Sequence, residues 1–131
     1  MDNINSTYLE AKKIMWVEDD KFLSDILARK LTESGANLIH LNIGEQAPSL
    51  AEKEMPDLIL LDILLPGMDG FTILEKLKSN PKTSSIPVIL LSNLGQKSDI
   101  EKGKKLGAVK FLIKASMGLD EIVYEIKGVL S

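Results

Sequence analysis

The sequence contains no cysteine and only one histidine among its 131 residues. Without cysteine there can be no disulfide bond, no thiolate catalysis and no zinc–thiolate site. A single histidine leaves little room for a histidine-based metal site or a Ser–His–Asp triad. Carboxylates, lysines and hydroxyl groups are therefore the side chains that remain for chemistry.

Long apolar runs and a strong excess of one charge are also lacking. Lys and Arg number 16 and Asp and Glu number 19, and the net charge of −3 does not indicate a nucleic-acid-binding surface. The longest apolar runs, residues 58–61 and 88–91, are much shorter than the about 20 residues of a membrane-spanning helix. Residues 1–10 lack the basic and apolar regions of a secretion signal. We therefore expect a cytoplasmic chain that binds neither nucleic acid nor membrane.

The length fits one domain, which we expect over residues 12–131 behind a flexible leader, residues 1–11. Within this domain, strand-like and helix-like segments alternate. The runs at 58–61 and 88–91 are wholly apolar, as in strands covered by helices on both faces. The expected strands are residues 13–17, 37–41, 58–61, 87–91 and 109–113. Expected helices follow them, with apolar stripes over 22–31, 71–77 and 119–130 and weaker patterns over 45–54 and 97–106.

This alternation predicts an α/β protein of (βα)₅ type, with a doubly wound, parallel, five-stranded sheet. The commonest strand order at this size is 2-1-3-4-5, the flavodoxin-like arrangement, and right-handed crossovers leave few alternatives. Ligands of such sheets bind beyond the carboxyl ends of the strands, near the point where the winding reverses. The side chains at those strand ends therefore decide the function.

Polar side chains follow four of the five expected strands. The acids Glu18, Asp19 and Asp20 follow the first strand and Asp62 follows the third, which is its neighbour in the predicted order. Two carboxylates about 4–5 Å apart repel by about 3–4 kcal/mol at an effective dielectric near 20, so the cluster predicts a bound cation. Mg²⁺ is the natural candidate, because it prefers oxygen ligands and works with phosphates.

The other strand ends suggest phosphoryl transfer. Asp62 could act as a nucleophile toward phosphorus and form an aspartyl-phosphate. Ser92 after the fourth strand could donate a hydrogen bond to a phosphoryl oxygen, and Lys114 after the fifth could supply a positive charge. Each residue also has an ordinary interpretation, since Asp19 or Asp20 can cap a helix and the others can be turn or surface residues. Because all of these residues are expected at one edge of the sheet, we favour a functional site over these ordinary interpretations.

Four segments resemble the receiver domain of two-component response regulators, and the resemblance covers about residues 12–130. They are IMWVEDD (14–20), PDLILLDILLPGMDG (56–70), PVILLS (87–92) and KFLIK (110–114). The resemblance implies that Asp62 is the phosphoacceptor and that Ser92 and Lys114 bind the phosphoryl group. It also implies an Mg²⁺ site made by Glu18, Asp19, Asp62 and the backbone carbonyl of Leu64. Phe111 matches the aromatic switch residue that turns inward on activation.

The resemblance also implies partners. The phosphoryl donor would be a histidine kinase or a histidine phosphotransfer protein, and the chain would catalyse only its own phosphorylation and dephosphorylation. The surface formed by segments 97–106, 109–113 and 119–130 would bind a downstream protein, with the chain a monomer or a weak phosphorylation-dependent dimer. We expect no output domain after residue 131, and therefore expect output by protein contact, either directly or in a phosphorelay.

Some positions depart from the family pattern. Ala115 replaces the usual Pro, and because a cis peptide before a non-proline residue costs about 3 kcal/mol we expect a trans bond there. Asn93 replaces a smaller residue and could narrow access to the phosphoryl group. The two positions that flank the attacking water in this family are Leu64 and Leu94, which cannot orient water, so we expect slow dephosphorylation.

Three other functions compete with this interpretation. An Mg²⁺-dependent phosphatase of the haloacid dehalogenase kind needs a second acid where this chain has Leu64. A flavin or nucleotide carrier needs a phosphate-binding loop, whereas Glu18, Asp19 and Asp20 would repel phosphate. A degenerate receiver that binds partners without phosphorylation stays open because of Asn93 and Ala115. Trp16 and His40 are expected to be structural, with His40 away from the site.

Overall fold

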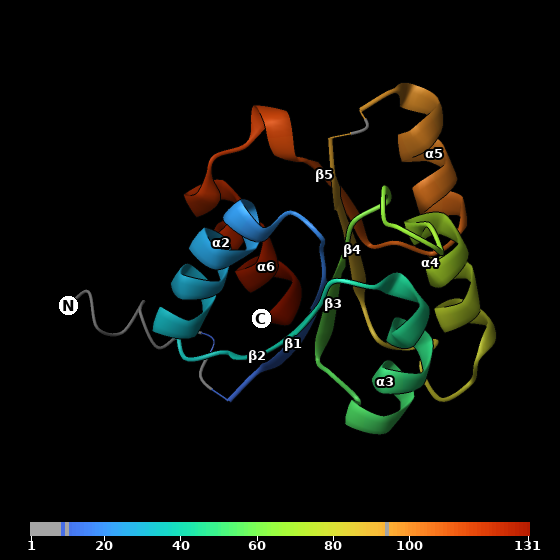
Figure 1. Cartoon of the computed structure of the whole chain (residues 1–131), viewed down its shortest axis with the longest axis horizontal. Coiled ribbons are helices and arrows are strands. Elements are labelled where there is room, and N and C mark those ends of the chain that lie inside the picture. Colours follow the sequence, from blue (N-terminus) through green and yellow to red (C-terminus); the bar gives the residue numbers. More distant parts are fainter. Residues whose placement is uncertain (1–8, 10, 94) are drawn as a thin grey trace.

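Five parallel strands form the centre of the molecule in the order β2-β1-β3-β4-β5, as predicted (Figure 1). The structure is a computed structural model that describes residues 9, 11–93 and 95–131. The strands are β1 (Lys13–Val17), β2 (Asn37–Leu41), β3 (Leu58–Leu61), β4 (Val88–Ser92) and β5 (Lys110–Ile113). The helices are α2 (Lys21–Glu33), α3 (Ala47–Glu54), α4 (Gly70–Ser79), α5 (Lys97–Lys105) and α6 (Leu119–Leu130), with short 3₁₀ turns at η1 (Gly44–Gln46) and η2 (Lys114–Ser116).

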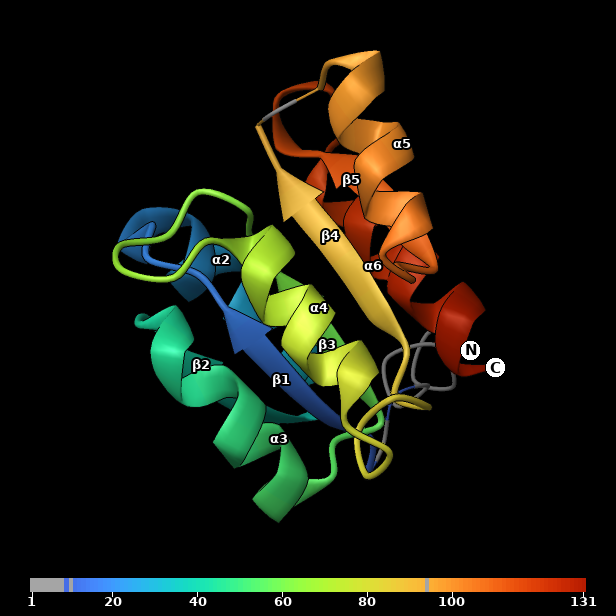
Figure 2. The same ribbon diagram turned by 90° about the vertical axis from the view of Figure 1, so that its right-hand side faces the viewer.

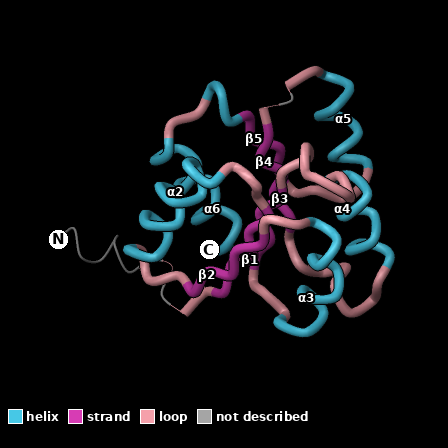
Figure 3. Tube along the Cα trace, viewed as in Figure 1, coloured by secondary structure: helices cyan, strands magenta, loops and turns pink. Residues whose placement is uncertain are grey.

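Helices cover both faces of the sheet. Helices α2 and α6 lie on one face, and α3, α4 and α5 lie on the other (Figures 1 and 2). The tube in Figure 3 shows the strands as one layer between these two sets of helices. The doubly wound prediction is therefore confirmed, and the winding reverses between β1 and β3.

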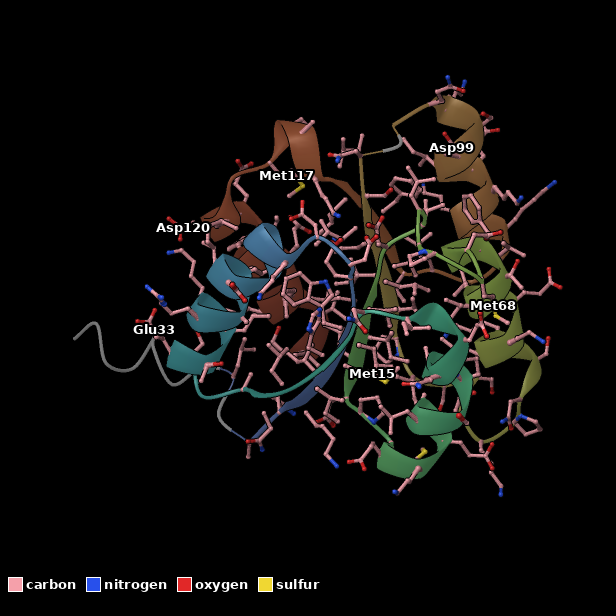
Figure 4. The ribbon with its side chains drawn as sticks, viewed as in Figure 1. Met15, Glu33, Met68, Asp99, Met117 and Asp120 are labelled. Carbon is pink, nitrogen blue, oxygen red and sulfur yellow. The ribbon has the colours of Figure 1, made fainter. Side chains whose placement is uncertain are left out.

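Alternate residues of the central strands belong to two separate hydrophobic clusters, one on each face of the sheet. On the α2 and α6 face, Trp16 packs with residues such as Leu60 and Ile126. On the other face, Met15 (labelled in Figure 4) packs with residues such as Leu61 and Leu74. All of these side chains are fully buried. Burial on both faces explains why the central strands are continuously apolar.

Element boundaries agree with the sequence to within one or two residues. Strand β4 begins and ends one residue later than expected, because Ser92 still pairs with Ile113 of β5. Gly35 has a φ of 93° just after α2, which is the left-handed conformation that favours glycine at a helix end. The segment expected as one short helix over 45–54 is divided into η1 and α3.

The expected leader lies mostly outside the described residues, so its flexibility stays a prediction. Leu9 is described, and its side chain is fully buried in the cluster under α2 and α6. Its N–H donates to the carbonyl of Ser34 at 2.9 Å, and the N–H of Ala11 donates to the carbonyl of Gly35 at 3.1 Å. At Leu9 the packed chain therefore begins earlier than the sequence suggested.

Among the described residues, no helix is both long enough and apolar enough to cross a bilayer.

Candidate functional site

The site lies at the carboxyl ends of the central strands, where the winding reverses. Val17 of β1 and Leu61 of β3 are register partners, so the residues that follow them come side by side. The N–H of Asp62 donates to the carbonyl of Val17 at 3.1 Å, which continues the β1–β3 ladder as far as the acid. The sheet register therefore brings together residues that are more than 40 positions apart in the sequence.

Three carboxylates gather at this edge. Glu18, Asp19 and Asp62 each offer an oxygen atom, and these oxygens lie within 4.8 Å of one another. Glu18 and Asp62 are buried, whereas Asp19 is exposed. The predicted acidic cluster is therefore present, and Asp19 is its solvent-facing member.

Lys114 brings a positive charge from β5 into this cluster. Its ammonium donates to Oδ2 of Asp62 at 3.0 Å and forms an ion pair with Oε1 of Glu18. The Lys114 side chain is only 10% exposed, so water screens these contacts weakly. One cation thus holds two buried acids that belong to different strands.

Burial shifts the proton affinities of this group. Burial raises the pKa of the Glu18 carboxyl to about 7, and the negative charge of Asp62 adds to this effect, while the hydrogen bond from Lys114 opposes it. Burial alone would lower the pKa of Lys114, but its hydrogen bonds to Glu18 and Asp62 raise it above the ordinary value. Lys114 therefore stays charged at neutral pH, whereas Glu18 titrates near neutrality in the metal-free protein.

The carboxylate of Asp62 is oriented by the backbone that follows it. Its Oδ1 accepts a hydrogen bond from the N–H of Ile63 at 2.7 Å and a longer one from the N–H of Leu64 at 3.4 Å. Its Oδ2 faces Lys114. The two oxygens therefore have different environments, one made by the backbone and one by a cation.

Gly70 allows the loop after β3 to close tightly on the site. Its N–H donates to the carbonyl of Ile63 at 2.8 Å, and a Cβ at this position would lie 2.7 Å from the Cα of Ile63. Asp69 caps α4 by accepting a hydrogen bond from the N–H of Thr72 at 3.0 Å. The loop therefore returns directly from Asp62 to the start of α4.

The other predicted residues lie around this centre. Ser92 is fully buried at the end of β4, and Phe111 on β5 is half-buried beneath α5. All peptide bonds of the described residues are trans, including the one before Ala115, which lies in η2. The role of the Leu64 carbonyl as a metal ligand stays a prediction, and Leu94 lies outside the described residues.

His40 was expected to lie away from the site, and the structure corrects this. Its Nε2 lies 2.8 Å from the carbonyl oxygen of Glu18, and its ring lies 5.7 Å from the ring of Trp16. One feature of the sequence could have indicated this contact. His40 lies near the end of β2, which pairs with β1, and Glu18 directly follows β1. A search limited to the residues that directly follow strands misses this contact, because His40 lies within its strand.

The donor set fits a hard divalent cation. All three side chains offer carboxylate oxygens, which Mg²⁺ and Mn²⁺ prefer, and one of them faces solvent so that water ligands can remain. The negative charge of Asp62 raises the pKa of Glu18, and a bound cation would relieve this repulsion between the two acids.

The fold and the site together define a doubly wound α/β protein with an acidic, oxygen-rich site at its switch point. A family model for the response regulator receiver domain matches residues 14–127. The chain therefore belongs to the response regulator receiver domain family, which confirms the resemblance seen in the sequence. Membership supports a phosphoacceptor role rather than that of a conventional enzyme.

Known relatives agree with this assignment. The chain is 39% identical over 102 residues to Response regulator PleD of Caulobacter vibrioides, covering 78% of this chain and 22% of PleD. It spans between 22% and 52% of the length of the curated relatives compared. A putative response regulator from Chloroflexus aurantiacus superposes with a TM-score of 0.85 at 30% identity, covering 92% of this chain and 98% of that one. The Mn²⁺-bound form of response regulator Rcp1 gives a TM-score of 0.77 at 31% identity, covering 90% and 91%.

Proposed function

We propose that this chain accepts a phosphoryl group on Asp62, in an Mg²⁺-dependent reaction, from the phosphohistidine of a histidine kinase or a histidine phosphotransfer protein. The observation that carries the proposal is the contact of the Lys114 ammonium with both Asp62 and Glu18, beside the solvent-facing Asp19. This arrangement offers a nucleophile, a fixed positive charge and a set of metal ligands at one point. We further propose that the protein works in the cytoplasm, as a monomer or a weak dimer.

The transfer requires little covalent chemistry from the protein. A carboxylate oxygen of Asp62 forms a bond to phosphorus while the phosphorus–nitrogen bond of the donor breaks, and the imidazole leaves with the electron pair of that bond. When the other ring nitrogen carries a proton, the leaving imidazole is neutral. Catalysis then depends on position and on neutralising the charge of the phosphoryl oxygens.

The residues of the site divide these tasks. Glu18, Asp19, Asp62 and the backbone carbonyl of Leu64 would hold Mg²⁺, which neutralises phosphoryl charge when it is bound. Lys114 binds a phosphoryl oxygen from the opposite side. Its position beside Oδ2 of Asp62 supports this role. The neighbour Rcp1 has been solved in an Mn²⁺-bound form, which supports the binding of a divalent cation by this chain.

Phosphorylation would act on the surface formed by α5, β5 and α6. A phosphoryl group adds about −1.5 to −2 charges and gives Ser92 and Lys114 a new partner. Lys114 directly follows β5, and Ser92 directly precedes the loop to α5. Phe111 lies between these two points and packs against α5 at Gly103. A shift of either residue toward the phosphoryl group would therefore change this surface, which we propose binds the downstream protein.

Phosphorylation by a small donor tests the proposal. Incubation with acetyl phosphate or phosphoramidate and Mg²⁺ should add one phosphoryl group, seen by intact mass spectrometry. The Asp62→Asn variant should gain none, and a chelator should abolish the gain in the wild type. Failure of the wild type to gain mass would favour a degenerate receiver that binds partners without phosphorylation. Sustained turnover of a general phosphatase substrate would favour the enzyme of the haloacid dehalogenase kind.

A further inference from the structure

The C-terminal end of β2 holds the backbone of Glu18 from both sides. The N–H of Glu18 donates to the carbonyl of Leu41 at 2.9 Å, as the last step of the β1–β2 ladder. The carbonyl of Glu18 accepts a hydrogen bond from Nε2 of His40 at 2.8 Å. A main-chain group and a side chain of adjacent β2 residues therefore fix the two peptide planes that flank Glu18.

The ring of His40 is itself held in place. Its centroid lies 5.7 Å from that of Trp16, with the two planes tilted by 56°. Trp16 is fully buried and is the register partner of His40 across the two strands. The exposed His40 thus has one face against the core and its Nε2–H directed at the loop that carries the acids.

The peptide that His40 contacts is the one that joins Glu18 to Asp19. Its orientation decides in which direction Asp19 leaves the sheet, because the carbonyl of Glu18 and the N–H of Asp19 belong to the same plane. The side chain of Glu18 adds a second restraint, since its Oε2 accepts the N–H of Asp20 at 3.1 Å. Asp19 itself faces solvent and depends on this backbone for its position.

We propose that His40 is a positioning residue for the divalent cation, and that its hydrogen bond to the Glu18 carbonyl sets the direction of Asp19. The inference rests on the proposed function, because it assumes that Asp19 binds the metal. Groups that orient metal ligands commonly contribute about tenfold or more to metal affinity. His40 acts one step further away, through the backbone, so we expect an effect of about three- to tenfold.

Two variants distinguish the effect of the N–H donor of His40 on metal binding from the effect of its ring. His40→Phe keeps an aromatic ring against Trp16 and removes the donor, whereas His40→Gln keeps a distal N–H and removes the ring. Mg²⁺ is titrated into each protein, and binding is followed by the fluorescence of Trp16, the single tryptophan of the chain. We expect the Kd of His40→Phe to rise about three- to tenfold and that of His40→Gln to stay within about twofold of the wild type.

Two further measurements separate positioning from a merely structural role. Urea unfolding reports whether either variant loses stability, and a structural role would lower stability while leaving the Mg²⁺ Kd unchanged. The backbone amide signals of Asp19 and Asp20 in metal-free NMR spectra should move in His40→Phe and stay near their wild-type positions in His40→Gln.

Each outcome decides the proposal. Equal Mg²⁺ affinity in all three proteins would overturn it, and so would an equal loss in both variants, because the ring would then matter and not the N–H. Absence of Mg²⁺ binding to the wild-type protein would instead contradict the metal site of the proposed function. Asp19→Asn serves as the control, since it should lose affinity whether or not His40 has a role.

Discussion

The side chain of Leu64 limits the rate at which an aspartyl-phosphate at Asp62 could be hydrolysed. It lies two positions after Asp62, and its side chain is 59% exposed. A leucine there cannot donate or accept a hydrogen bond, so it cannot orient a water molecule for attack on an aspartyl-phosphate. The proposed phosphorylated state should therefore last longer than seconds.

Replacing Leu64 by a polar residue should shorten that lifetime. We expect Leu64→Gln to speed loss of the phosphoryl group by about tenfold, which corresponds to about 1.4 kcal/mol of barrier and is similar to one hydrogen bond. The rate is measured by intact mass after removal of the phosphoryl donor. Leu64→Met is the matched control and should decay at the wild-type rate. A wild-type lifetime of seconds, or equal rates in all three proteins, would contradict the prediction.

At this scale the sequence predicted the acids and the lysine but not the histidine. The positions of Glu18, Asp62 and Lys114 follow from the rule that ligands bind at the carboxyl ends of parallel strands. His40 lies within a strand, and its contact with Glu18 depends on a side chain that reaches along the sheet. Strand order alone does not reveal such a contact.

Among the elements, α5 lies close to the sheet at a glycine. Its sequence has few apolar residues, so the helical pattern over 97–106 is weak. In the structure Gly103 is buried against β4 and β5. A Cβ at this position would lie 2.7 Å from Cδ1 of Leu90 and 3.2 Å from the ring of Phe111. The glycine therefore lets α5 approach the sheet and lie against Phe111.

Two glycine-to-alanine changes test this packing. Gly103→Ala should destabilise the protein by about 1–2 kcal/mol, because overpacking outweighs the better helix propensity of alanine. Gly128→Ala on α6 is the matched control, since a Cβ there meets no atom within 4 Å, and it should stabilise by up to about 1 kcal/mol. Urea unfolding measures both changes. Equal effects of the two substitutions would show that Gly103 has no packing role.

The elements themselves followed closely from the sequence. Continuous apolar runs alternating with helix-like segments indicated a buried parallel sheet. The strand order followed from the commonest arrangement at this size and from right-handed crossovers. The end of β4 was missed by one residue because Ser92 is polar, although it pairs with β5 and is fully buried. The packing role of Gly103 could not be predicted, because it depends on the distance between α5 and the sheet, and the hydrophobic pattern of the sequence does not give that distance.

For the whole molecule, the metal-free site couples stability to pH. The pKa of Glu18 is about 7 in the folded protein and about 4.5 ordinarily, with burial as the main cause. Protonation of Glu18 therefore favours the folded state. Its stabilising effect is complete below about pH 4.5 and is lost as the pH rises through about 7.

Metal-free protein should thus be more stable at pH 5.5 than at pH 8, by about 2 kcal/mol, since each pKa unit corresponds to about 1.4 kcal/mol. Glu18→Gln should be nearly insensitive to pH over this range. Excess Mg²⁺ should raise stability most at pH 8, because the metal binds the ionised acids. Urea unfolding in the presence of a chelator, and again with Mg²⁺, measures these differences. A pH dependence that persists in Glu18→Gln would assign the effect to other groups.

Lys114 directly follows the edge strand β5, yet its ammonium contacts the acids that follow β1 and β3, nearer the middle of the sheet. The turn η2 that begins at Lys114 is therefore tied by two ion pairs to acids of other strand ends. A divalent cation bound by these acids would compete with the Lys114 ammonium for them and so weaken the tie to residues 114–116. We therefore expect metal binding and the position of this turn to be coupled through the two ion pairs of Lys114.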